Sequence, residues 1–373
     1  MRILFTFAGG SGHLEPLVPV AHAAEAAGHT VAFAGRPWMT PVVEALGFRA
    51  FAAGSDVGLK PERLPLAPID LERDMGAVGS GFGRRIARER AADLLPLCGD
   101  WRPDLVVCEE LDFGAMVVAE RLGLRHATVL VIAAGSFVRP EIVAPPLDEV
   151  RAAHGLPPDP ALAMPSRHLV LSPFAPSYRD PAFPLPAKAH SLRLLEPSAR
   201  SSTTPTVYFT LGTIYNVESG DLFSRVLAGL RDLEMQVIVT VGRDIDPAEL
   251  GPQPGNVRIE RYVPQATLLP QCDLVVSHGG SGSVASALAH GLPMVLIPLG
   301  ADQPLNAARC ETLGVARVLD AGTATPSMAR AAAARVLEDP TCRRNAERIA
   351  DEIAALPGSE HAILLLERLV SER

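Results

Sequence analysis

The chain has few cysteines, no long apolar run and no dense stretch of basic residues, and each shortage excludes a class of protein. Its 373 residues include five cysteines: Cys98, Cys108, Cys272, Cys310 and Cys342. An odd number of cysteines, with no pair at Cys-x-x-Cys spacing, is typical of reduced thiols and argues against a disulfide framework. We therefore expect a cytoplasmic protein.

Apolar runs and basic clusters are equally limited. The longest apolar stretch, residues 127–138, is interrupted by Gly135 and Ser136. It is too short for a membrane span, which takes about 20 apolar residues. The net charge is −8, and the one basic cluster, within residues 84–90, is typical of a solvated helix face. We expect no membrane span and no nucleic-acid partner.

What the chain has is alternation of strands and helices. Hydrophobic residues make up 48% of it, enough for two domains with large cores. Short, β-branched apolar runs alternate with segments of helical periodicity, as in parallel sheets covered on both faces. The strand-like runs of the first half are residues 3–8, 30–35, 104–109 and 127–133.

The pattern breaks in the proline-rich segment 139–205, where only residues 168–172 resemble a strand, and 196–205 is the expected linker. It then restarts, with strand-like runs at 207–212, 236–241, 257–263, 273–278, 293–298 and 316–320. The sequence therefore predicts an α/β protein with two doubly wound, Rossmann-like halves.

Each half contains a glycine-rich turn after a buried strand. The first reads Gly10-Ser11-Gly12-His13. It lacks the third glycine of a dinucleotide fingerprint and places a histidine at the start of a helix. Taken alone, this histidine is better explained as a loop or helix-cap residue than as a catalytic one.

The second turn is richer in groups that suit a phosphate. After the strand 273–277 come His278, Gly279, Gly280, Ser281, Gly282 and Ser283, and then a helix. Helix N-termini expose N–H groups and partial positive charge, so this turn predicts a diphosphate site. The two serines can cap the helix and can also donate to phosphate oxygens. After the next strand, Asp302 and Gln303 are adjacent polar groups suited to sugar hydroxyls.

Three motifs together resemble those of bacterial family-1 glycosyltransferases, which attach nucleotide-activated sugars to natural products. They are AGGSGHLEPLVPVAHAAEAAGH (8–29), RYVPQATLLPQCDLVVSHGGSGSVASALAHGLP (261–293) and PLGADQPLNA (298–307). The resemblance implies a GT-B fold, in which two doubly wound domains face each other across a cleft. It implies an acceptor domain at 1–200, a nucleotide-sugar domain at 201–350, and a C-terminal helix at 351–373 that packs on the first domain.

The resemblance assigns His13 as the general base that deprotonates the acceptor hydroxyl. The family places an aspartate beside this histidine, and the matching position here is Glu109, one methylene longer. Glu110 and Asp112 are competing partners, and a solvent-exposed acidic cluster is the alternative reading. Segments 52–100 and 139–200 carry no family motif, and 52–100 suggests a mobile loop over an apolar acceptor.

The donor contacts implied by the resemblance lie in the second half. Gly212 and Thr213 match the loop that touches the diphosphate, and Val263 and Gln265 match the segment that packs on the base. Ser286 stands where plant relatives carry a ribose-binding glutamate, which favours a dTDP-sugar over a UDP-sugar.

The expected activity is inverting transfer of a sugar to a hydroxyl of an apolar natural product, with a deoxyhexose from a dTDP-sugar favoured over a hexose from a UDP-sugar. No metal and no further cofactor are expected, because Asp244 and Asp246 read as a solvated turn. The protein is expected to be a monomer or homodimer. A nucleotide-sugar epimerase and a non-catalytic activator of another transferase remain as alternatives.

Overall fold

The computed structural model describes residues 1–56, 63–195 and 201–372, and the chain divides into two compact units. The first unit contains residues 1–59, 72–194 and 356–373, and the second contains residues 60–71 and 195–355. Of the expected linker, residues 196–200 lie outside the described residues. The sequence did not indicate that residues 60–71 belong with the second unit.

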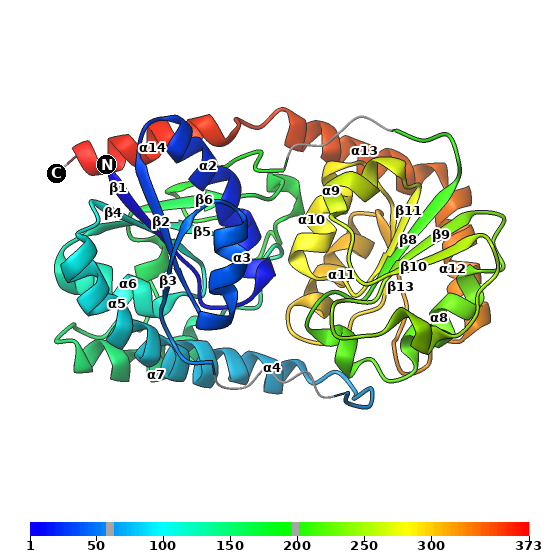
Figure 1. Cartoon of the computed structure of the whole chain (residues 1–373), viewed down its shortest axis with the longest axis horizontal. Coiled ribbons are helices and arrows are strands. Elements are labelled where there is room, and N and C mark those ends of the chain that lie inside the picture. The colour runs from blue at the N-terminus through cyan, green and yellow to red at the C-terminus, as the bar shows by residue number, and fades with distance from the viewer. Residues whose placement is uncertain (57–62, 196–200, 373) are drawn as a thin grey trace. The chain divides into compact units, whose positions relative to one another are not determined.

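Within the described residues, the first unit holds a seven-stranded parallel sheet in the order β3-β2-β1-β4-β5-β6-β7 (Figure 1). Its strands are β1 (Arg2–Thr6), β2 (Thr30–Gly35), β3 (Arg49–Ala52), β4 (Leu105–Glu109), β5 (Arg125–Val129), β6 (Leu169–Ser172) and β7 (Ala189–Ser191). The α-helices are α1 (Ser11–Leu14), α2 (Val18–Ala26), α3 (Thr40–Ala45), α4 (Leu71–Ala77), α5 (Ala87–Trp101), α6 (Phe113–Leu122), α7 (Pro140–Ala153) and α14 (Ser359–Ser371).

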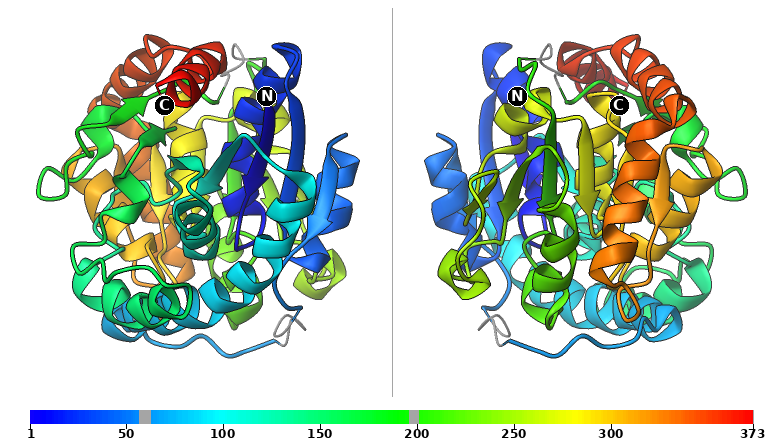
Figure 2. Two further views of the ribbon diagram at one scale, coloured as in Figure 1. Left: turned by 90° about the vertical axis from the view of Figure 1, so that its left-hand side faces the viewer. Right: turned by 90° about the vertical axis from the view of Figure 1, so that its right-hand side faces the viewer.

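The second unit, over the same described ranges, holds a six-stranded parallel sheet in the order β10-β9-β8-β11-β12-β13. The strands are β8 (Thr206–Thr210), β9 (Gln236–Thr240), β10 (Val257–Glu260), β11 (Leu274–Ser277), β12 (Met294–Leu296) and β13 (Ala316–Val318). The helices are α8 (Leu222–Leu230), α9 (Gln265–Leu268), α10 (Ser281–Ala289), α11 (Gln303–Thr312), α12 (Pro326–Glu338) and α13 (Pro340–Ala354). Helices flank both sheets (Figure 2), so the predicted α/β class with two doubly wound sheets is confirmed.

The strand order reverses at one place in each sheet. β1 pairs with β4, with Thr6 opposite Cys108, and β8 pairs with β11, with Thr210 opposite Ser277. At such a reversal the loops after the two strands turn to opposite faces and leave a crevice at the carboxyl edge. The residues that follow these four strands are therefore the first place to look for a binding site in each unit.

Two segments differ from the sequence-based expectation. The stretch expected as a mobile acceptor loop is largely helical, because α4, a π-helix at Val78–Ile86 and α5 run continuously from residue 71 to 101. In the proline-rich segment, Pro140 occupies the first turn of α7, where its missing N–H costs nothing. The short strands β3 and β7 were also not predicted.

Residues 63–71 pack within the second unit. The Leu64 N–H donates to the Val217 carbonyl at 3.0 Å, and Leu66 packs against the core cluster of that unit. A Cβ on Gly220 would lie 3.0 Å from the Leu66 nitrogen, so the chain passes close to this glycine. Arg63 forms an ion pair with Glu249.

The last helix completes the core of the first unit, beside α2 (Figure 1). Ala362, Ile363 and Leu366 of α14 are buried with Val20 and other side chains of α2. In the described part of the chain no helix is long and apolar enough to cross a membrane. The last helix, α14, begins at Ser359 and contributes to the core beneath the first sheet.

We predict that Leu366→Ala lowers the free energy of unfolding of the whole chain by about 2–5 kcal/mol, because it opens a cavity at a fully buried position. Leu364→Ala is the matched control, since Leu364 lies on the same helix and is 62% exposed. Urea denaturation of both variants measures the difference. Similar small losses would show that α14 is not an integral part of this core.

Candidate functional site

His13 lies in the crevice of the first unit, directly after β1. The chain leaves β1 through Gly9 and Gly10 and enters α1, where the His13 N–H donates to the Gly10 carbonyl at 3.0 Å. A Cβ on Gly9 would lie 2.2 Å from His13 Cδ2. Only glycine therefore lets the backbone pass against the face of the imidazole.

Glu109 is the last residue of β4 and reaches the same point. Its Oε1 lies 3.1 Å from His13 Nδ1, and the Glu109 side chain is fully buried while that of His13 is 22% exposed. Glu109 also accepts N–H groups of Ala8 at 3.1 Å and Leu111 at 2.7 Å. A carboxylate at this distance favours the tautomer with the proton on Nδ1, which leaves the lone pair on Nε2, on the side of the ring away from the carboxylate.

The competing acids hold other groups. Glu110 accepts the N–H groups of Val131 and Ile132, each at 3.0 Å, and burial raises the pKa of its carboxyl. Asp112 forms a buried ion pair with Arg90 and accepts the Ala115 N–H as the N-cap of α6. The alternatives left open by the sequence are thus separated by geometry, and Glu109 is the acid that contacts His13.

In the second unit, the turn after β11 leads into α10. Gly279 has φ +84°, and Gly280 is the N-cap, with no side-chain hydrogen bond capping this helix in the described structure. Neither of the two serines named by the sequence occupies the N-cap position. The Ser281 hydroxyl instead contacts Asp302, and Ser283 Oγ lies 3.5 Å from Gln265 Nε2. Because the N-cap residue is a glycine, it has no side chain with which to cap the first turn of α10.

His278 is held between two glycine backbones. A Cβ on Gly212 would lie 2.7 Å from its Nε2, and a Cβ on Gly280 would lie 2.5 Å from the same atom. Its Nδ1 is buried and has no hydrogen-bond partner within the described residues. Burial lowers the pKa of His278 to about 4, so at neutral pH the imidazole is uncharged. A ligand here would meet a neutral hydrogen-bonding group.

The loop after β12 is tied to the same turn. Asp302 Oδ2 accepts from Ser281 and, at 2.8 Å, from Asn306 Nδ2, and Asn306 also donates to the Gly279 carbonyl at 3.0 Å. Gln303 is buried, and its Oε1 accepts the N–H groups of Leu299 and Gly300. A sugar contact by Gln303 would therefore fall to its amide nitrogen.

Sequence reasoning missed Asn306. Its side chain is fully buried and joins the turn before α10 to the first turn of α11. The available signal was its position four residues after Asp302, which places both side chains on one helix face.

The remaining predicted donor residues lie on neighbouring loops. Gly212 has φ +79° after β8, and Thr213 beside it is exposed. Val263 and Gln265 are half-buried at the start of α9, next to Tyr262, whose ring lies under the Arg243 guanidinium at 5.5 Å. All the predicted donor residues thus come from loops at the carboxyl ends of strands in one sheet.

Asp244 and Asp246 do not form part of this arrangement. Asp246 caps a short 3₁₀ helix through the Ala248 N–H at 3.0 Å and lies 3.4 Å from Arg261. Among the described side chains, no three His, Cys, Asp or Glu residues gather as metal ligands would.

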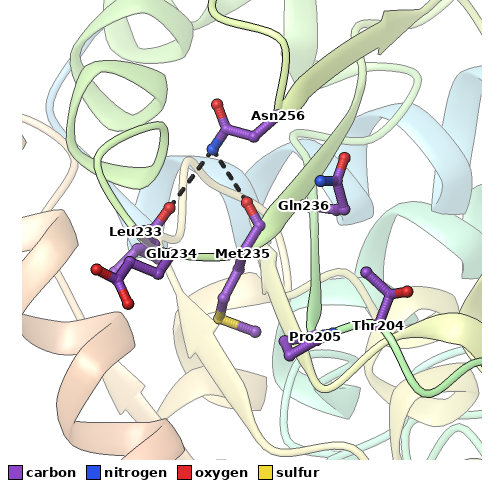
Figure 3. A pocket seen from close by; sticks show the side chains of 7 residues that line it. All are labelled: Thr204, Pro205, Leu233, Glu234, Met235, Gln236 and Asn256. Atoms are coloured by element: carbon purple, nitrogen blue, oxygen red, sulfur yellow. Dashed lines mark hydrogen bonds between the residues drawn. The ribbon is translucent and has the colours of Figure 1, made fainter.

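A shallow surface pocket of about 310 Å³ lies elsewhere in the second unit (Figure 3). Its lining comprises Thr204, Pro205, Leu233, Glu234, Met235, Gln236 and Asn256. These residues precede β8, β9 and β10, at the amino edge of the sheet. Because ligands of doubly wound sheets bind at the carboxyl edge, this pocket is not the candidate site.

Comparisons with known proteins identify relatives of the whole chain. Residues 224–369 match the family model of the erythromycin biosynthesis protein CIII-like C-terminal domain. The chain is 32% identical to an L-demethylnoviosyl transferase of Streptomyces niveus, over 96% of this chain and 95% of that protein. It is 30% identical to a tylactone mycaminosyltransferase of Streptomyces fradiae, over 100% and 93%.

A solved glycosyltransferase structure has the same fold as this chain. The glycosyltransferase VinC, in complex with dTDP, superposes with a TM-score of 0.78 at 25% identity, and the match covers 100% of both chains.

The buried histidine predicts a pH effect on stability. Between pH 6.5 and about 4 the unfolded chain protonates His278 while the folded chain keeps it neutral, so stability falls as the pH is lowered. In His278→Asn this contribution is absent. We expect the free energy of unfolding of the variant to fall less steeply with decreasing pH than that of the wild type. Near pH 5 the two slopes should differ by about 1 kcal/mol per pH unit. Denaturation curves from pH 7 to 4.5 test this, and parallel pH profiles would contradict it.

Proposed function

Since this chain belongs to the bacterial family-1 glycosyltransferases that act on natural products, we propose that it transfers a deoxyhexose from a dTDP-sugar to a hydroxyl of an apolar natural product, with inversion at the anomeric carbon. The observation that carries the proposal is the contact of His13 Nδ1 with the buried Glu109 at the strand reversal of the first sheet.

His13 acts as the general base in this mechanism. Nε2 takes the proton of the acceptor hydroxyl as its oxygen attacks the anomeric carbon, and the bond from that carbon to the diphosphate breaks. Attack opposite the leaving group inverts the configuration. Glu109 holds the tautomer and stabilises the imidazolium as it forms, and its bonds to Ala8 and Leu111 keep the carboxylate in place.

The turn before α10 receives the diphosphate. The N-terminus of α10 supplies N–H groups and the positive end of the helix dipole, and Gly212, Gly279 and Gly280 let the phosphates approach the backbone. Neutral His278 adds a hydrogen bond without charge repulsion or attraction. These groups can stabilise the leaving diphosphate without a metal ion.

The preference for dTDP rests on two observations. Ser286 stands at the position where a ribose-binding carboxylate would contact a 2′-hydroxyl, and deoxyribose lacks that group. The dTDP in the VinC complex supports the same nucleotide. The five cysteines are all buried and form no disulfide, which supports a function in the reducing cytoplasm.

We predict that His13→Gln lowers the transfer rate by about 10²- to 10⁴-fold, the usual contribution of a general base. Glu109→Gln should lower it less, since the amide can still orient the ring but cannot stabilise the imidazolium.

Mass spectrometry of products from dTDP-deoxysugars and hydroxylated aglycones measures the rate, and NMR of the product gives its anomeric configuration. The matched control is His22→Gln, an exposed histidine of α2. An active His13→Gln enzyme would contradict the base assignment.

We also predict that calorimetric titration shows tighter binding of dTDP than of UDP, and that His278→Ala weakens both. The physical reason is that the neutral His278 imidazole contacts the diphosphate, which the two nucleotides share. Tighter binding of UDP would contradict the Ser286 argument and direct the search to hexose donors. Binding of neither nucleotide would contradict the donor site.

A further inference from the structure

Phe82 stacks on the imidazole of His13. The two ring centroids are 5.6 Å apart and the ring planes differ by 13°. Phe82 is half-buried and lies on the π-helix Val78–Ile86, between α4 and α5. Nothing in the proposed chemistry uses this side chain, and the family motifs in the sequence do not include it.

The π-helix is fixed against α7 by two glycines. A Cβ on Gly79 would lie 2.5 Å from the Ile142 carbonyl oxygen, and a Cβ on Gly83 would lie 3.3 Å from the Val143 carbonyl oxygen. In α7 the Ile142 carbonyl would normally accept the N–H of residue 146, but Pro146 has no N–H. The close approach of Gly79 instead places a Cα–H against this carbonyl oxygen. This packing determines the distance of the Phe82 ring from the imidazole of His13.

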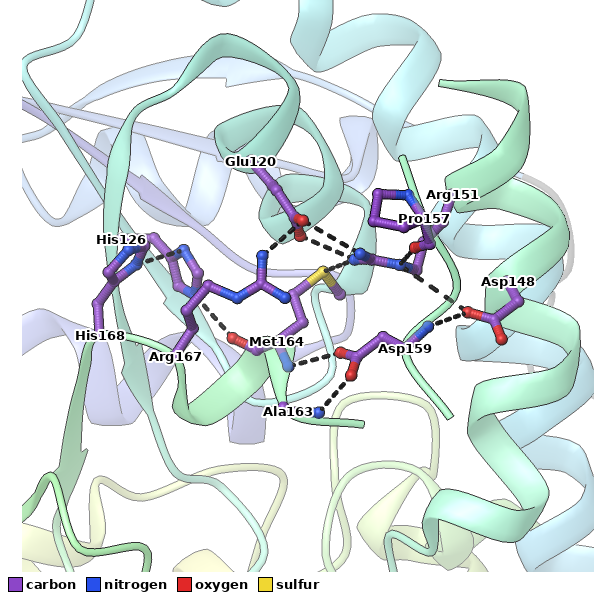
Figure 4. A network of polar contacts seen from close by, with 10 residues as sticks. All are labelled: Glu120, His126, Asp148, Arg151, Pro157, Asp159, Ala163, Met164, Arg167 and His168. Atoms are coloured by element: carbon purple, nitrogen blue, oxygen red, sulfur yellow. Dashed lines mark hydrogen bonds and ion pairs between the residues drawn. The ribbon is translucent and has the colours of Figure 1, made fainter. Parts of the chain in front are cut away.

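α7 is itself anchored to α6 and to the loop that follows α7 (Figure 4). The Arg151 guanidinium is almost fully buried and donates to Glu120 of α6 at 2.8 and 3.1 Å and to the Pro157 carbonyl at 2.9 Å. A helix held by such bonds cannot shift without leaving a buried charge unpaired. The support of Phe82 therefore extends from the π-helix to the centre of the first unit.

The Glu109 contact alone does not fix the plane of the imidazole. The χ2 torsion of a histidine has a broad energy minimum, so the ring can change its orientation while Nδ1 stays near Glu109. Gly9 packs against the ring, and the parallel ring of Phe82 adds a second flat surface. The direction of the Nε2 lone pair depends on this plane.

We propose that Phe82 is a positioning residue for His13: by stacking on the imidazole it holds the ring plane in which Nδ1 meets Glu109 and Nε2 points to the acceptor hydroxyl. This inference rests on the proposed role of His13 as the base. Phe82 does not take part in the proton transfer, and its effect reaches the reaction through the orientation of His13.

The first test is spectroscopic and needs no substrate. The chain contains ten histidines, so labelling their Cε1 atoms with ¹³C gives a countable set of NMR signals, and the signal lost in His13→Gln identifies His13. In Phe82→Leu the His13 signal should move, because the ring current of Phe82 is removed, and in Phe82→Tyr it should stay near its wild-type position. Phe51→Leu, the same change at a half-buried phenylalanine of β3, should leave it unmoved.

The second test separates positioning from acceptor binding. Phe82→Leu should lower kcat by about 10- to 100-fold, as expected for a misplaced catalytic group, with the KM of the nucleotide sugar unchanged. Phe82→Tyr should restore kcat. A higher acceptor KM with unchanged kcat would overturn the proposal and make Phe82 an acceptor contact, as would an unmoved His13 signal in Phe82→Leu.

Different results would contradict the base role of His13 and the positioning role of Phe82. If His13→Gln retains full activity, the base assignment fails and the positioning role falls with it. If His13→Gln is inactive while Phe82→Leu matches the wild type in kcat and in the His13 signal, only the role of Phe82 is overturned.

Discussion

The parallel pairing of β1 with β4 is the constraint from which the chemistry of the first unit follows. Because Thr6 lies opposite Cys108, the residues just beyond the two strands emerge side by side at one edge of the sheet. His13 and Glu109 are 96 positions apart in the chain yet lie within hydrogen-bond distance. The same pairing of β8 with β11 brings Gly212 to His278. Each unit thus places its reactive groups where its strand order reverses.

Buried charges reinforce these crevices. Arg90 of α5 is fully buried and donates to Asp112 and to the carbonyls of Ala34 and Ala53, which end β2 and follow β3. An isolated buried guanidinium would be very unfavourable, so this set of bonds must form as a whole. It fixes the carboxyl ends of β2, β3 and β4 together, and Glu109 sits three residues before Asp112. The position of Glu109 is therefore a property of the sheet edge.

The sequence predicted the buried parallel strands well, since strands covered on both faces read as continuous apolar runs. It predicted the glycine turns because their spacing is visible without a structure. It could not choose among Glu109, Glu110 and Asp112, since three acids after one strand differ only in the direction of their side chains. It missed α7, because Pro145 and Pro146 inside a helix contradict local propensity and are tolerated only through packing. Phe82 and Asn306 were missed for a similar reason: their partners lie far away in sequence.

The division of the chain into units has an evolutionary consequence. The boundaries fall at 59/60, 71/72, 194/195 and 355/356, so neither unit is a continuous piece of sequence. A single genetic crossover near residue 195 between two such enzymes would join the second sheet of one parent to residues 60–71 of the other. It would also place a foreign α14 against α2. Exchange of the second unit therefore requires the short segment 60–71 to be transferred together with residues 195–355, while α14 is retained. Hybrids made at one junction inherit mismatched cores in both units.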